Sequence, residues 1–305
     1  MSARASGGNT RSAPDRGSCS APSRLGRSST WRTAASSCSS RTATTRPSPT
    51  SSSTGWSDAV ERAEYGRMFT LEDGLWWYRA VRLYLADAVA ALPSGAAVLD
   101  AGCGSGGNMV MLAGHASRVT GCDLSLDAIA LARRRGLPRL LSADVNALPF
   151  RDRAFDGVVC CDVLECDEVD ESRALAELAR VTRRGGRVIL TVPAYQFLLS
   201  EHDHAIHSVR RYTIVRLRAA LRGHALRVLR LRYLFGWLLP AIVGYRVVRR
   251  LLPGRRSGTA PRSDLFLPPG PINQALLGVS QAERAVGRWL PLPFGTTILA
   301  ELEAV

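Results

Sequence analysis

The sequence predicts an α/β fold in which short apolar strands alternate with amphipathic helices around an open, mostly parallel sheet. Strands of four to six residues are indicated at 96–99, 119–123, 141–145, 157–161 and 187–192. Helices are indicated at 126–135 and 172–181, each followed by a glycine that ends it or turns the chain. Several of the strands are apolar over consecutive residues, which is typical of parallel strands buried on both faces.

A glycine loop follows the first strand. Asp100 ends the strand, Gly102, Gly104 and Gly106 follow, and a helix is expected from about Asn108. Glycine has no Cβ, so it adopts positive φ readily and lets a ligand contact bare backbone. The loop therefore predicts a nucleotide-like ligand at the carboxyl end of the first strand.

The glycine spacing by itself fits two kinds of cofactor. Gly102-x-Gly104-x-x-Gly107 matches the dinucleotide fingerprint. A carboxylate at Asp100 is unfavourable beside a pyrophosphate, but it suits a ligand with a cationic amino-acid group. Asp123 and Asp144 end the second and third apolar segments, and Asp123 lies where a ribose-binding carboxylate is expected.

With these residues the chain resembles the class I S-adenosylmethionine-dependent methyltransferases, in particular the type 11 group, from about Ala59 onward. The resemblance implies S-adenosyl-L-methionine as cofactor, with the loop after Asp100 at its methionine part. It assigns Asp123 to the ribose hydroxyls, Asp144 to the adenine amine, and Leu124 and Val145 to the faces of the adenine ring. The cofactor-binding set implied is Asp100, Gly102, Cys103, Gly104, Gly106, Asp123, Leu124, Asp144, Val145 and Asp162.

The resemblance also implies a Rossmann-like, seven-stranded, mostly parallel sheet that closes with a C-terminal antiparallel hairpin. Leu226–Tyr233 alternates apolar residues with arginine and predicts a half-buried strand. Residues 292–300 are expected to form its antiparallel partner. A helical insertion over about 234–290, including a helix at 272–290, is expected before that last strand.

The first 55 residues differ in composition from the rest and predict a disordered basic tail, with residues 56–305 as the methyltransferase domain. Eight arginines and Asp15 give the tail a charge of +7, half of the chain's +14. Such a tail suits nucleic acid or anionic lipid. The interpretation we favour is a mis-assigned start, because the folded domain needs none of it.

Cysteine usage predicts a reducing compartment. The chain has seven cysteines, an odd number, and no C-x-x-C pair, so we expect a cytoplasmic protein with no zinc site and no disulfide framework.

The loop after the fifth strand, residues 193–213, is the expected substrate region. It resembles the H-D-x-x-x-x-H-x-R-R-Y loop of one type 11 subgroup, and no metal is expected despite its H-D-H-x-x-H spacing. Either His202 or His207 is the candidate proton acceptor. Tyr195, Arg210 and Arg211 are candidate substrate contacts, the arginines for an anionic group. A salt-bridged helix cap is the alternative for these polar residues.

Trp77 and Tyr78 belong to a segment that resembles the H-W-W-Y-R element of many type 11 methyltransferases, with Leu75 in place of the histidine. They are expected to form a lid over the cofactor. The alternative is that these aromatic side chains pack over the edge of the sheet.

The function expected is methyl transfer to a small or lipid-like acceptor, with no choice among O-, N- and C-methylation. A nicotinamide-dependent oxidoreductase is one alternative. A non-catalytic cofactor-binding scaffold is the other, because Cys166 and Leu75 stand where the family has histidines. A nucleic-acid acceptor is not expected, since no N/D-P-P-Y motif is present.

Residues 234–256 combine about a dozen apolar residues with a following arginine cluster. A membrane span needs about 20 apolar residues, so the segment is too short to cross a bilayer. It predicts peripheral contact with an anionic membrane at the inner face. A helix that covers the active site or a dimer face is the alternative, and the oligomeric state is left open.

Overall fold

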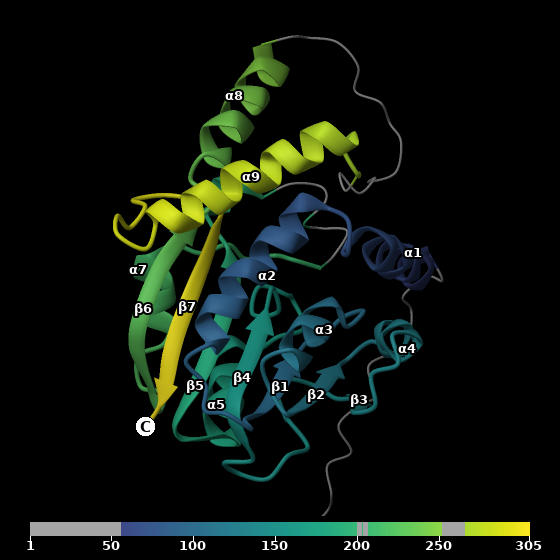
Figure 1. Cartoon of the computed structure of the whole chain (residues 1–305), viewed down its shortest axis with the longest axis vertical. Coiled ribbons are helices and arrows are strands. Elements are labelled where there is room, and N and C mark those ends of the chain that lie inside the picture. The colour runs from purple at the N-terminus through teal and green to yellow at the C-terminus, as the bar shows by residue number, and fades with distance from the viewer. Residues whose placement is uncertain (1–55, 200–202, 204–206, 252–265) are drawn as a thin grey trace, which may run out of the picture. The chain divides into compact units, whose positions relative to one another are not determined.

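The computed structural model describes residues 56–199, 203, 207–251 and 266–305. Within them one sheet of seven strands has the order β3-β2-β1-β4-β5-β7-β6 (Figure 1). The strands are β1 (Ala97–Ala101), β2 (Arg118–Asp123), β3 (Leu140–Ser142), β4 (Phe155–Cys161), β5 (Thr182–Pro193), β6 (Leu226–Leu234) and β7 (Thr297–Ala304). The helices are α1 (Trp56–Leu71), α2 (Trp76–Val89), α3 (Gly107–Ala113), α4 (Leu126–Arg134), α5 (Glu171–Val181), α7 (Ile214–Ala220), α8 (Leu238–Leu251) and α9 (Gly270–Val286), with a 3-10 turn η1 (Gln196–Leu198).

The pairing of the strands confirms the predicted seven-stranded, Rossmann-like sheet. β3, β2, β1, β4 and β5 are parallel neighbours, and β7 lies antiparallel between β5 and β6. The last strand begins at Thr297, so its predicted start at residue 292 was wrong. Pro293 lacks the N–H that a strand ladder uses. Gly295 lies so close to Leu234 that a Cβ would be 2.2 Å from the Leu234 carbonyl oxygen.

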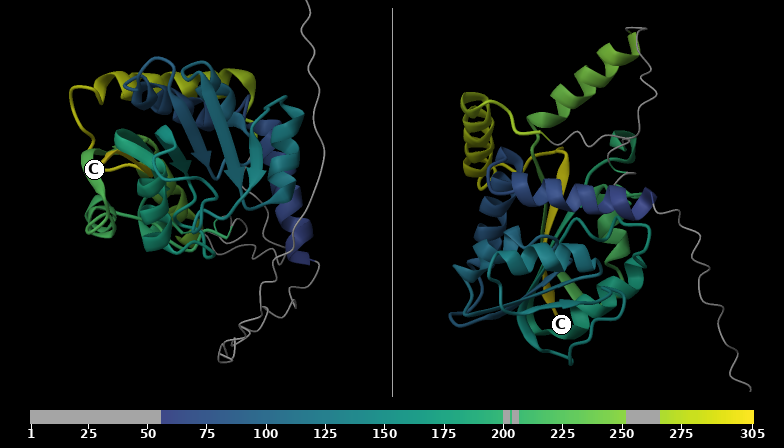
Figure 2. Two further views of the ribbon diagram at one scale, coloured as in Figure 1. Left: turned by 90° about the horizontal axis from the view of Figure 1, so that it is seen from below. Right: turned by 90° about the vertical axis from the view of Figure 1, so that its right-hand side faces the viewer.

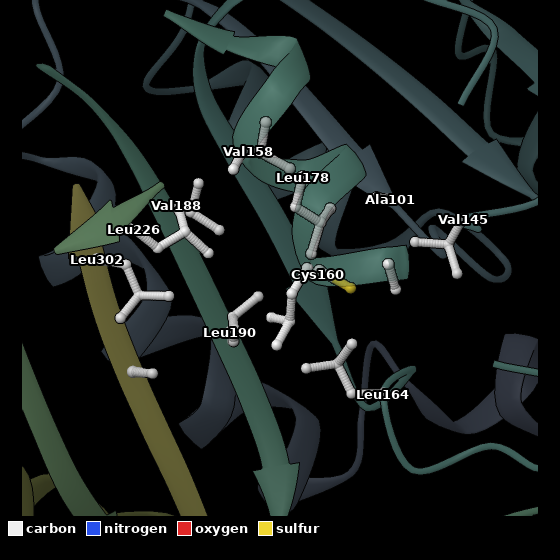
Figure 3. Packing of buried hydrophobic residues seen from close by; sticks show 14 of the residues in the cluster. Ala101, Val145, Val158, Cys160, Leu164, Leu178, Val188, Leu190, Leu226 and Leu302 are labelled. Atoms are coloured by element: carbon white, nitrogen blue, oxygen red, sulfur yellow. The ribbon is translucent and has the colours of Figure 1, made fainter. Parts of the chain in front are cut away.

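The core has one apolar cluster on each face of the sheet, because successive residues of the central strands point to opposite faces. Val158 and Cys160 of β4 join the cluster under α5, and Figure 3 shows them beside Leu178. Val159 of β4 joins the other cluster, under α2 and α9. These buried runs fix the carboxyl ends of the parallel strands at one edge of the sheet.

The insertion between β6 and β7 contains the helices α8 and α9 in the described residues, as predicted, but α9 ends at Val286 and not at the predicted residue 290. The side chain of Asn273 on α9 accepts a hydrogen bond from Trp76 N (2.9 Å) and donates one to Gly74 O (2.9 Å). Arg284 pairs with Asp87 of α2, its Nε 2.7 Å from Oδ2. α8 extends beyond the carboxyl edge of the sheet (Figures 1 and 2).

Some of the sequence-based predictions fall outside the described residues, among them the tail 1–55, His202, and residues 252–256 of the arginine-rich segment. In the part that is described, no helix is long and apolar enough to cross a membrane. The five cysteines described there are free thiols, and no metal-binding group of His, Cys, Asp and Glu is found among the same residues.

Candidate functional site

The glycine loop between β1 and α3 turns sharply at three positive-φ positions. Gly102, Gly104 and Gly106 have φ of 80°, 52° and 85°. The backbone N–H groups of Gly102 and Cys103 donate to Cys122 O at 2.8 and 2.9 Å, which holds the loop against the end of β2. The loop thus has a fixed backbone conformation before any ligand binds.

Two glycines of the loop have different surroundings. A Cβ at Gly102 would lie 2.2 Å from Val163 Cγ2, so the backbone is in direct contact with the segment after β4. A Cβ at Gly104 would meet nothing within 4 Å. Gly104 therefore borders open space, where a ligand can lie against bare backbone.

Asp100 is a buried carboxylate beneath this loop. Its residue is 0% exposed, and neither carboxylate oxygen has a hydrogen-bond partner among the described residues. Burial, with the nearby charges of Asp123 and Glu72, raises the pKa of Asp100 to about 8. An unsatisfied buried carboxylate is costly unless a cation or a donor group approaches it.

Asp123, at the end of β2, is held by two backbone groups. Gly104 N donates to its Oδ2 at 2.8 Å and Ser125 N to its Oδ1 at 2.9 Å. Burial raises the pKa of Asp123, against these hydrogen bonds. The carboxylate is therefore fixed beside the open face of the loop, where hydroxyl groups of a ligand can donate to it.

Sequence reasoning missed Glu72, which follows α1. Its carboxylate accepts hydrogen bonds from Ser105 Oγ and from Arg135 Nη2, the latter at 2.7 Å. A Cβ at Gly107 would lie 2.2 Å from Glu72 Oε2. Glu72 thus joins the turn after α1 to the glycine loop, and it adds a third carboxylate near Asp100.

The residues assigned to the adenine follow β2 and β3: Leu124 comes directly after β2, whereas Asp144 and Val145 lie beyond β3, which ends at Ser142, so the predicted strand end at residue 145 was wrong. Leu124 is 55% exposed, whereas Val145 is 8% exposed and packs in the cluster of Figure 3. Asp144 is exposed, and its Oδ1 accepts a hydrogen bond from Asn146 N at 2.8 Å. Since Ala143 N donates to Asp123 O, the two strand ends are adjacent, as the assignment requires.

Asp162 lies directly after β4 in a strained conformation, with φ of 53°. Thr191 Oγ1 donates to its Oδ1 at 3.1 Å, and burial raises its pKa to about 6. Positive φ at a non-glycine residue costs energy and is often retained where the side chain has a role. Asp162 therefore lies at the carboxyl edge between the glycine loop and the segment after β5.

Trp77 and Tyr78 lie on α2, with ring centroids 5.0 Å apart. Burial raises the pKa of Tyr78, with contributions from the charges of Glu72 and Asp162. Tyr78 therefore lies within reach of the charges of Glu72 and Asp162, and the lid role stays a prediction. The ring centroids of Trp77 and Phe235 are 6.5 Å apart, so Trp77 also packs against an aromatic residue next to the sheet, as in the alternative interpretation.

The two arginines predicted to hold a substrate anion instead make internal contacts. Arg210 donates through Nη2 to the carbonyl oxygens of Cys166 and Val169, the latter at 2.6 Å. Arg211 donates to Ala194 O at 3.2 Å and pairs with Asp203 at 2.7 Å. These contacts fit the alternative of a structural cap better than an anion site.

Tyr195 and His207 both have positive φ, at 59° and 57°. The Tyr195 ring stacks on Tyr233 with centroids 5.4 Å apart. The His207 side chain is 45% exposed and lies 3.8 Å from Asp167. The structure therefore places Tyr195 in an aromatic stack and His207 on the surface.

Glu165 is a second residue that sequence reasoning passed over. It is 3% exposed, its Oε2 has no partner among the described residues, and burial raises its pKa well above the usual range. Its carbonyl oxygen accepts from the backbone N–H groups of Val209 and Arg210. In the sequence Glu165 is only the neighbour of Cys166, and its burial is visible only in the structure.

Residues 99–190 match the family model described as "Methyltransferase domain". The chain is 35% identical over 123 residues to a demethylmenaquinone methyltransferase of Mycolicibacterium vanbaalenii, covering 40% of this chain and 51% of that protein. It is 37% identical over 116 residues to phthiotriol/phenolphthiotriol dimycocerosates methyltransferase 1 of Mycobacterium ulcerans, covering 36% of this chain and 42% of that protein. The chain thus spans about half the length of these relatives or less.

The fold is also similar to a chain of the solved complex between the Haloferax volcanii Trm112 methyltransferase activator and a methyltransferase. The TM-score is 0.52 at 21% sequence identity, covering 82% of this chain and 97% of that chain. At this identity the similarity concerns the fold alone.

Proposed function

We propose that this chain, which carries a class I, S-adenosylmethionine-dependent methyltransferase domain of type 11, transfers a methyl group to a small or lipid-like acceptor. The observation that carries the proposal is the buried carboxylate of Asp100, without a partner among the described residues, beneath a loop with open backbone at Gly104. A ligand that brings positive charge and hydroxyl groups satisfies this site.

The same geometry argues against a dinucleotide. A pyrophosphate over the loop would lie near the carboxylates of Asp123 and Glu72, and its charge would oppose the ionisation of Asp100; like charges at short distance in a poorly solvated site repel strongly. Gly104 N, a donor that a phosphate would use, is already bonded to Asp123. The nicotinamide alternative is therefore disfavoured by charge as well as by hydrogen bonding.

S-adenosyl-L-methionine, when bound, supplies a methyl group activated on a positively charged sulfur. Asp100 would balance positive charge on the ligand, and Asp123 would accept hydrogen bonds from its ribose. The lid residues Trp77 and Tyr78 would exclude water and limit the directions from which an acceptor approaches. Orientation of this kind accounts for several kcal/mol of a methyl-transfer barrier, about 7 or more where alignment is good.

The acceptor side of the proposal is apolar and aromatic. Tyr195, Tyr233 and Phe197 stack at the carboxyl edge, with neighbouring centroids 5.4 Å apart. The two relatives described above are named for demethylmenaquinone and for dimycocerosates, which supports a lipid-like acceptor. The proton acceptor stays a prediction at His202 or His207. The division of the chain at residue 55 and a cytoplasmic location are also predictions.

The test is calorimetric titration of the full chain with S-adenosylmethionine, S-adenosylhomocysteine and NAD. We expect micromolar binding of the first two ligands and none of NAD. Asp123→Ala should weaken binding about tenfold or more, because a charge-assisted hydrogen bond is worth about 1.5–3 kcal/mol. The matched control is Asp152→Ala, at an exposed acid of the opposite edge.

Binding of NAD alone would overturn the assignment of the glycine loop. Cofactor binding without turnover of any lipid-like or small acceptor would instead favour the scaffold alternative.

A further inference from the structure

The outward face of α9 carries no charged side chain. Its exposed residues include Ile272, Val279 and Val286, which are 53%, 46% and 54% exposed and recur every seven residues. Glu283 and Arg284, the charged residues of the helix, are half-buried and make contacts within the fold. A helix on the surface of a soluble domain normally directs charged residues to solvent, so this face is expected to meet another apolar phase.

Apolar side chains are also exposed past the C-terminal end of α9, where the one charged residue before them, Arg288, pairs with Asp87 at 3.1 Å. Trp289 is 90% exposed and Leu290 is 65% exposed. Phe266 and Leu267, just before α9, are 70% and 51% exposed. Aromatic residues exposed to this degree are unfavourable in water, whereas tryptophan is enriched at the boundary between a bilayer and water.

α8 adds a helix of a different character to the same end of the domain. Val243, Tyr245 and Val248 are 37%, 62% and 53% exposed. In sequence, arginines recur at 246, 249 and 250, which are positions on one side of a helix by its 3.6-residue repeat. An arginine-rich helix with exposed apolar residues is typical of segments that lie in a membrane interface.

The net positive charge of this region favours an anionic lipid surface over a second copy of the chain as its binding partner. Residues 238–251 and 266–290 contain five arginines and one acid, a net charge of +4. The acid, Glu283, accepts hydrogen bonds inside the fold, from Phe235 N at 2.6 Å and Tyr84 Oη at 3.1 Å. Two of the arginines pair with Asp87 of α2, which leaves arginines 246, 249 and 250 as the excess positive charge. Two copies that met through this region would bring positive charge against positive charge, whereas anionic lipid head groups would attract it.

We propose that α8, the outward face of α9 and Trp289 form a docking surface for an anionic lipid bilayer. Docking itself does not require methyltransferase activity. If the proposed activity is correct, the docked bilayer is the place from which a lipid-like acceptor would enter the site. Asn273 and Arg284 tie α9 to α2, the helix that carries Trp77 and Tyr78. The bilayer surface would therefore lie close to the lid of the site.

The test is co-sedimentation of the full chain with vesicles of phosphatidylcholine alone and with phosphatidylglycerol added. We expect binding to the anionic vesicles that weakens with salt. Replacing arginines 246, 249 and 250 by glutamine should weaken binding by about fivefold per arginine, since each contributes about 1 kcal/mol near an anionic surface. The matched control replaces arginines 118, 151 and 184, exposed residues at the opposite edge of the sheet.

An apolar pair of variants tests the α9 face separately. Val279→Glu with Val286→Glu should abolish most vesicle binding, whereas Val215→Glu, at an 80% exposed valine of α7, should leave it unchanged. Titration of each variant with S-adenosylhomocysteine reports on the cofactor site independently of docking.

Equal sedimentation with neutral and anionic vesicles, or none with either, would overturn the proposal. So would a dimer of the wild-type chain that Val279→Glu with Val286→Glu separates into monomers, because the α9 face would then be an interface between copies.

Discussion

Asp100→Asn should remove a pH dependence of stability that the wild-type protein has. The pKa of Asp100 is about 8 in the folded chain, against an ordinary value of 3.8. The folded state therefore holds a proton that the unfolded state has lost between about pH 4 and pH 8. Linkage then requires that the free energy of unfolding falls as pH rises through this window.

The magnitude follows from the width of the window. One pKa unit corresponds to about 1.4 kcal/mol, so the ceiling between pH 5 and pH 8 is about 4 kcal/mol. Buried carboxylates respond as if the surrounding dielectric constant were nearer 20 than 4, which lowers the expected loss to about 2–3 kcal/mol. Asp123 and Asp162 also have raised pKa values, but they are common to both proteins and cancel in the comparison.

The assay is urea unfolding of both proteins at several pH values, with Asp152→Asn as the surface control. The variant should equal the wild-type protein near pH 5 and exceed its stability by about 2–3 kcal/mol at pH 8. In calorimetry at pH 7, binding of cationic S-adenosylmethionine should release about one proton from the wild-type protein and none from the variant. An identical pH slope in the two proteins would refute the burial argument for Asp100.

Three further predictions concern packing and local ties. Gly102→Ala should lower the free energy of unfolding by about 2–4 kcal/mol, because the added Cβ would lie 2.2 Å from Val163. Gly136→Ala, also at positive φ but with nothing within 4 Å, should lower it by about 1 kcal/mol, and denaturant unfolding of both variants measures the difference. Arg210→Ala should lower the free energy of unfolding by about 1–3 kcal/mol, because two carbonyl groups lose their donor. The control is His207→Ala at an exposed side chain, and an equal effect of the two variants would contradict a structural role for Arg210. A double-mutant cycle of Arg284 and Asp87 should give a coupling energy of about 1 kcal/mol, and a value near zero would show that this pair does not fasten α9 to α2.

The strands of the parallel sheet were predictable because burial on both faces leaves apolar runs in the sequence. The positions of Asp100 and Asp123, the acids proposed to contact the cofactor, were predictable for a related reason, since they occupy strand ends whose positions follow from those runs. The start of β7 was not predictable, because the close approach of Gly295 to Leu234 is a tertiary contact.

Residues whose surroundings come from distant segments were the ones that the sequence did not identify. Glu72 enters the site only because the turn after α1 lies against Gly107, and Glu165 becomes informative only once its burial is known. The arginine pair after His207 shows the converse. The sequence shows a charged residue in the predicted substrate loop, but only the structure shows that Arg210 already donates its hydrogen bonds to backbone carbonyl groups.

The hydrogen bonds of Asn273 restrict how the site can open. This side chain binds Trp76 N, the first backbone group of α2, and Gly74 O in the turn just before it; α2 is the helix that carries the proposed lid residues. α2 therefore cannot swing away from the glycine loop without either carrying α9 along or breaking both bonds. If Trp77 and Tyr78 form the proposed lid, entry of an acceptor would require movement of α9 together with α2, and a contact made on the outer face of α9 would then affect how readily the site opens.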